Sequence, residues 1–163
     1  MITTITEREL PADLLSLWVK AQQAVQTQNY KYGVSIIKTI IKRAPGFLEG
    51  RKVLRACEVK TTPDAGRRSS LFGGMRITSR KNPEETIVVI EDELEKDPYS
   101  VTANETLYTA AEACGLHDLA AFALDTICQG QPNAKKHLHM LASHYVKYEQ
   151  FAEAADTYRK VLA

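Results

Sequence analysis

The spacing of the prolines is the feature that most constrains how this 163-residue chain can fold. Four of its six prolines are Pro11, Pro45, Pro98 and Pro132. The first and last intervals between them are both 34 residues, and the middle interval of 53 exceeds 34 by 19. A fixed period of roughly 20–50 residues is the sequence signature of a repeat architecture. The prolines therefore predict a 34-residue repeat, with one insertion in the second unit.

Small and apolar residues follow the same period. In three units a small residue lies 22 positions after the proline, and large apolar residues follow it by four and seven positions. The small residues are Gly33, Ala120 and Ala154, and the large ones are Ile37, Ile40, Leu124, Ile127, Tyr158 and Val161. Positions i, i+4 and i+7 share one face of a helix, and a proline disfavours a helical residue before it. The pattern predicts helix–turn–helix units. A simple helical bundle would not require this period.

These positions resemble the tetratricopeptide repeat (TPR) family, whose 34-residue signature is W-x2-L-G-x2-Y…A-x3-F…P. The best-matching unit places these residues at the signature positions: Leu138, Leu141, Ala142, Tyr145, Ala154 and Tyr158. The first unit departs from the signature at Lys20 and Ala24, and the third unit at Tyr108. The resemblance implies an all-α fold, an α-α superhelix or TPR-like solenoid. It would contain about four helix-turn-helix units in one domain, residues 1–163.

The second unit is the interrupted one. Its helices are predicted over 47–60 and 83–96, with Asn82 as the N-cap and Pro83 at the first helical position. Between them, residues 61–82 form a Gly/Ser/Arg-rich insertion with a net charge of +4. We expect a surface loop there, and a functional arm is the alternative. Residues 84–97 have a net charge of −6, so this helix either faces solvent or contacts a basic group.

Composition limits the partners and the compartment. The formal net charge of +1 argues against a dedicated binder of nucleic acids or anionic membranes. The chain has three cysteines, Cys57, Cys114 and Cys128, which are far apart and form no CxxC motif. Such a small, odd number of cysteines is typical of proteins from a reducing compartment. The N-terminus lacks a signal-peptide pattern, and the longest apolar-rich window is interrupted by lysine. We expect a cytoplasmic protein without a membrane partner.

The sequence lacks the common catalytic and phosphate-binding motifs. It contains no glycine-rich phosphate loop after a strand, no HExxH and no nucleophile elbow. His137, His139 and His144 are the only histidine cluster. Zinc needs convergent ligands, so we interpret the three as exposed helix histidines. The sequence therefore predicts no catalytic residue, no cofactor and no metal, and hence a protein that is not an enzyme.

The resemblance also implies a binding surface. In the TPR family the first helices of the units line a concave groove that takes extended peptides or partner helices. The equivalent positions here are Trp18, Gln22, Glu105, Thr109, Glu112, Lys136, His139, Ser143 and Lys147. The implied function is a protein–protein interaction scaffold or adaptor for a peptide or partner helix. The alternative is an RNA-binding helical repeat, although Glu105 and Glu112 would repel phosphates.

The last unit ends on apolar residues, among them Tyr145, Val146, Phe151 and Tyr158. Each solenoid unit leaves one side apolar for the next, so an uncapped end exposes that side. Exposed apolar patches often mark interfaces. A homo-oligomer formed through the C-terminal end is therefore a further expectation.

Overall fold

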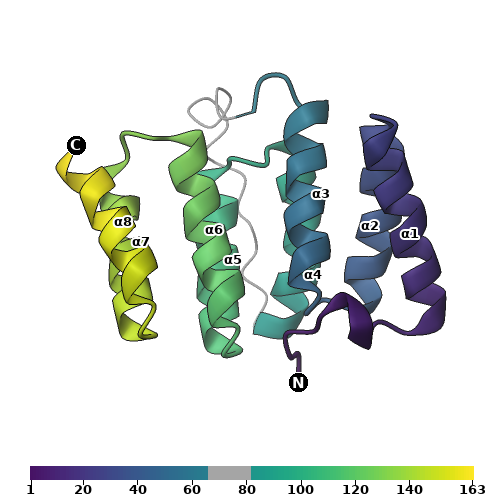
Figure 1. Ribbon diagram of the computed structural model, residues 1–163, viewed down its shortest axis with the longest axis horizontal. Coiled ribbons are helices and arrows are strands. Elements are labelled where there is room, and N and C mark those ends of the chain that lie inside the picture. The colour runs from purple at the N-terminus through teal and green to yellow at the C-terminus, as the bar shows by residue number, and fades with distance from the viewer. Residues whose placement is uncertain (66–81) are drawn as a thin grey trace.

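The computed structural model describes residues 1–65 and 82–163, which form an all-α fold (Figure 1). A short 3-10 helix, η1 (Glu7–Glu9), precedes the α-helices. The α-helices of the described residues are α1 (Ala12–Gln26), α2 (Tyr30–Arg43), α3 (Leu48–Thr61), α4 (Pro83–Lys96), α5 (Val101–Ala113), α6 (His117–Gly130), α7 (Lys135–Lys147) and α8 (Phe151–Leu162). None of these helices is long and apolar enough to span a membrane.

The helices repeat with the predicted period. Pro83, His117 and Phe151 begin α4, α6 and α8 at intervals of 34 residues, and Val101 and Lys135 begin α5 and α7 at the same interval. The described residues therefore form an α-α superhelix of four helix pairs. The predicted cap is also present, because the Asn82 side chain accepts a 3.0 Å hydrogen bond from the Glu84 N–H.

The repeat positions pack as their residue types predict. Gly33, Ala120 and Ala154 are all buried. The larger residues that follow on the same helix faces are fully buried in the first and third pairs: Ile37, Ile40, Leu124 and Ile127. In the last pair Tyr158 and Val161 are only half-buried, since no further helix follows α8 in the described residues.

The described α-helices form two layers, which are visible in Figure 1. The near layer consists of α1, α3, α6 and α8, and the far layer of α2, α4, α5 and α7. Helix α3 contacts α6 within the near layer, and α4 contacts α5 within the far layer. The first helix of each pair therefore lies in the near layer in the first two pairs and in the far layer in the last two.

Three apolar clusters form the core. One joins α1, α2 and α3, the second α4, α5 and α6, and the third α6, α7 and α8. In the first cluster the Trp18 and Phe47 rings meet edge to face, with centroids 5.0 Å apart. The first two clusters are separated at the α3–α4 interface, where charged side chains take the place of apolar ones.

The α3–α4 interface contains a buried charge cluster, formed by Arg51, Arg55 and Glu58 of α3 and Glu91 of α4. Each of these side chains is at most 4% exposed. Arg51 and Arg55 both pair with Glu91, and Arg55 also pairs with Glu58. For the acidic helix, the sequence left open whether it faces solvent or contacts basic groups. Helix α4 contacts basic groups. On its other side, Lys38 of α2 pairs with Asp92 and Glu95.

The predicted insertion is described only at its ends. Thr61 closes α3 and Asn82 caps α4, whereas residues 66–81 lie outside the described residues. The three cysteines are free thiols, of which Cys57 and Cys128 are buried. Burial raises the pKa of the Cys128 thiol to about 11.

Candidate functional site

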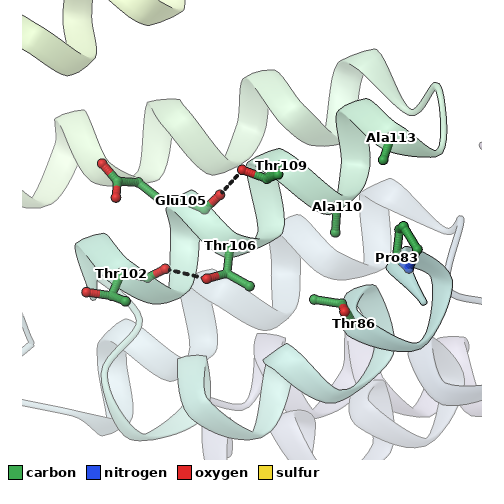
Figure 2. A pocket seen from close by; sticks show the side chains of 8 residues that line it. All are labelled: Pro83, Thr86, Thr102, Glu105, Thr106, Thr109, Ala110 and Ala113. Carbon is green, nitrogen blue, oxygen red and sulfur yellow. Dashed lines mark hydrogen bonds between the residues drawn. The ribbon is translucent and has the colours of Figure 1, made fainter. Parts of the chain in front are cut away.

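A shallow cavity lies between α4 and α5 in the far layer, with a volume of about 320 Å³. Figure 2 shows the side chains that line it, with Pro83 and Thr86 from α4 facing a row of α5 residues. The α5 residues are Thr102, Glu105, Thr106, Thr109, Ala110 and Ala113. Pockets of about 300–1,000 Å³ are typical of ligand sites, so this one has room for a few side chains.

Three of the four threonine hydroxyls that line this cavity donate hydrogen bonds within the protein. Thr106 donates to the Thr102 carbonyl at 2.8 Å and Thr109 to the Glu105 carbonyl at 3.0 Å (Figure 2). Thr86 donates to the Asn82 carbonyl at 3.1 Å. Apart from the Thr102 hydroxyl and the Glu105 carboxylate, a ligand would therefore meet mainly methyl groups and small alanines. Such a surface suits apolar side chains and allows the backbone of a partner to approach closely.

The acidic residues of α5 are paired across the boundary with α7. Glu105 lies 2.8 Å from Nε2 of His137 and 3.9 Å from Nζ of Lys136. Glu112 accepts from Nζ of Lys147 at 3.0 Å and from the Tyr148 hydroxyl at 3.2 Å. Partial burial opposes ionisation of Glu112, but the hydrogen bond from Lys147 and the nearby side chains of His144 and His117 together outweigh it, so the pKa of this carboxyl is lowered. These charges hold α5 to α7.

A second cavity of about 350 Å³ lies beside α7. Its lining combines Tyr108 of α5 with Met140, His144 and three of the predicted groove residues: His139, Ser143 and Lys147. His139 is exposed and meets the Tyr158 ring edge to face, with centroids 5.8 Å apart. Aromatic and thioether groups thus extend the binding surface of the far layer towards α8.

The predicted groove residues fall into two groups. Glu105 and Thr109 line the α4–α5 cavity. Across the α5–α7 boundary, Lys136 pairs with Glu105 and Lys147 pairs with Glu112. Trp18 and Gln22 lie on α1, in the near layer and at the other end of the stack. Trp18 is also only 1% exposed, so placing it on a groove was wrong. The first two pairs have their first helix in the near layer and the last two pairs have it in the far layer, so α1 lies in the layer opposite to α5 and α7.

The histidine interpretation was wrong for two of the three residues. His139 is exposed as expected, but His137 and His144 are buried. Nε2 of His144 lies 2.9 Å from the His117 carbonyl, and its Nδ1 lies 3.6 Å from Glu112. The sequence did not reveal that Glu105 lies beside His137 and Glu112 beside His144, because each glutamate is more than 30 positions away from its histidine. Within the described ranges, no three His, Cys, Asp or Glu residues are grouped to hold a metal ion.

Thr106, Ala110 and Ala113 also line the cavity and were not among the predicted groove residues. A signal for them exists, because Thr102, Thr106, Thr109 and Ala113 recur at helical spacing and are all small. Small residues on one stripe of a helix indicate close approach of another chain or helix. Which helix lies across from that stripe was not predictable, because local spacing does not record how α4 packs against α5.

No known family model matches the chain, and no curated protein matches its sequence. Among solved structures the chain is similar to a mutant form of the protein MamA, with a TM-score of 0.43 and 14% sequence identity. The match covers 91% of this chain and 95% of that one. The assignment of the fold therefore rests on the four helix pairs and on their 34-residue period.

Proposed function

We propose that this chain is a divergent TPR-type interaction scaffold, without enzymatic activity, that docks a peptide or helix of a partner protein along the far layer. The supporting observation is the α4–α5 cavity, where three of the four lining threonine hydroxyls donate hydrogen bonds within the protein and two further lining residues are alanines. Apolar anchors of a partner at positions i, i+3 and i+4 could rest there, as in other helix-in-groove interactions.

Charge supports a protein partner over RNA at this surface. Glu105 is 40% exposed beside the cavity, and a phosphate backbone approaching it would be repelled. The lysines nearest to it, Lys136 and Lys147, are engaged with Glu105 and Glu112. A partner would therefore be held mainly by burial of apolar groups, with binding that depends little on salt. The cytoplasm remains the predicted compartment.

The test is affinity purification with quantitative mass spectrometry, comparing the wild-type chain with Thr109→Arg. Thr109 is exposed at the cavity, so a long cation there would fill it. Thr39→Arg is the matched control, because Thr39 is also on a helix surface and its hydroxyl also donates to the carbonyl four residues earlier. A partner lost with Thr109→Arg and kept with Thr39→Arg supports the proposal.

The interaction must then be reproduced with the two purified proteins, by isothermal titration at low and high salt. Partners that bind the two variants equally would contradict the proposed site. Recovery of RNA with strong salt dependence, in place of a protein, would contradict the proposed class of partner.

A further inference from the structure

A larger cavity lies on the opposite layer, between α3 and α6, with a volume of about 450 Å³. It forms where α3 of the second helix pair lies beside α6 of the third pair within the near layer. The lining residues are Lys52, Arg55, Ala56, Val59, Lys60, Tyr99, Phe122, Asp125, Thr126 and Gln129. None of them belongs to the groove of the far layer.

The α3 side of this cavity is cationic. Lys52 and Lys60 are both exposed and form no ion pair with any residue that the structure describes. They lie eight residues apart on α3, with the exposed Ala56 midway between them. Because positions four apart stack on one helix face, the two ammonium groups flank a small central residue. The opposing acid, Asp125, already accepts a 2.6 Å hydrogen bond from Gln129.

Arg55 adds a buried charge to the same wall. Its two terminal nitrogens pair with Glu58 and Glu91, but its Nε has no partner among the described residues. Its guanidinium carbon lies 5.9 Å from the centre of the Phe122 ring. Burial raises the pKa of Glu58 to about 8, which opposes its negative charge beside Arg55.

Part of the lining is apolar: Ala56 and Val59 come from α3, Phe122 from α6, and Tyr99 precedes α5. The two exposed lysines together with these apolar lining groups are complementary to a chain that alternates carboxylates with hydrophobic side chains. Nucleic acid fits less well, because its phosphates would meet Asp125, and the side chains of Ala56, Val59 and Phe122 offer the bases no donor.

We propose that the α3–α6 cavity binds an acidic segment of a partner protein, with carboxylates at Lys52 and Lys60 and an apolar side chain on Ala56 and Phe122. This site is additional to the groove of the far layer, since the two lie on opposite layers. The scaffold would thus contact protein segments of different character on its two faces.

The test selects peptides from a random displayed library on the wild-type chain, and repeats the selection on Lys52→Glu/Lys60→Glu. All recovered peptides are then measured by fluorescence anisotropy. We expect a set rich in Asp and Glu whose affinity falls about tenfold or more in the double variant. Ala56→Phe, which fills the cavity and keeps its charge, should weaken the same peptides. The control Lys20→Glu/Lys31→Glu reverses two other exposed lysines and should bind them normally.

Three results would overturn the proposal. The first is a selection without acidic peptides. The second is acidic peptides that bind Lys52→Glu/Lys60→Glu as well as wild type, or lose equal affinity with Lys20→Glu/Lys31→Glu. The third is a labelled single-stranded RNA that binds more tightly than any selected peptide and depends on Lys52 and Lys60. Circular dichroism of each variant confirms that it is folded, which exposed positions should allow.

Discussion

Arg55 and Glu91 form a buried two-point ion pair, in which Nη1 donates to Oε2 and Nη2 to Oε1, both at 3.1 Å. This fork joins α3 to α4, the two helices whose connection contains the insertion. Glu91 also accepts from Arg51, whose other terminal nitrogen donates to the Pro45 carbonyl at 2.9 Å. One carboxylate thus organises two arginines at the interface where charged side chains separate two apolar clusters.

Glu91→Gln should lower the free energy of unfolding by about 3–5 kcal/mol, because it leaves two buried guanidinium groups without their charge partner. Urea denaturation followed by circular dichroism measures it. The control is Glu93→Gln on the same helix, since Glu93 pairs with the exposed Lys96. Its effect should stay below about 1 kcal/mol. Equal effects of the two variants would contradict a buried cluster.

Stability should fall by about 1–2 kcal/mol between about pH 6 and pH 8. Burial raises the pKa of Glu58 from 4.5 to about 8, so over this range the native state keeps a proton that the unfolded chain has already released. The unfolding free energy therefore decreases as pH rises. Glu91 has the opposite effect in acid. Burial opposes its charge, but Arg55 and Arg51 together lower its pKa. Stability is therefore lost as the pH falls below about 4.

Glu58→Gln removes the titrating proton and should flatten the slope between pH 6 and pH 8, measured as urea midpoints across a pH series. Glu49→Gln, on the same helix but outside the buried cluster, should keep the wild-type slope. A slope unchanged by Glu58→Gln would mean that Glu58 is ionised in the folded state.

Two helical glycines should respond to alanine with opposite signs. A methyl at Gly33 would lie 3.7 Å from the Cys57 sulfur, an ordinary contact, so Gly33→Ala should stabilise the fold by about 0.5–1 kcal/mol. A methyl at Gly50 would lie 2.4 Å from the Phe47 ring, so Gly50→Ala should destabilise it by about 1–3 kcal/mol. Differential scanning calorimetry compares the two. Destabilisation by both would show that α2 packs more tightly than described.

Ala154→Leu and Ala120→Leu should each lower stability by about 1–3 kcal/mol, because these alanines are at most 3% exposed and added methylenes overpack the site. The neighbouring Ala155 is exposed, so Ala155→Leu should change stability by less than about 0.5 kcal/mol. Thermal melts of the three variants measure this. Unchanged melting temperatures for Ala120→Leu and Ala154→Leu would refute the repeat register.

The sequence by itself determined the helix pairs and their period. Pro83 and Asn82 mark the start of α4, and the buried alanines at 120 and 154 follow from local spacing, because a helix and its apolar face are encoded within a few turns. Only the tertiary structure decided which faces meet. Arg55 pairs with Glu91, 36 positions away, and α1, which contains Trp18, lies in the layer opposite to α5, which contains Thr109. Such contacts depend on side chains that are distant in the sequence and on how the helices pack, and a local sequence period contains no information about either.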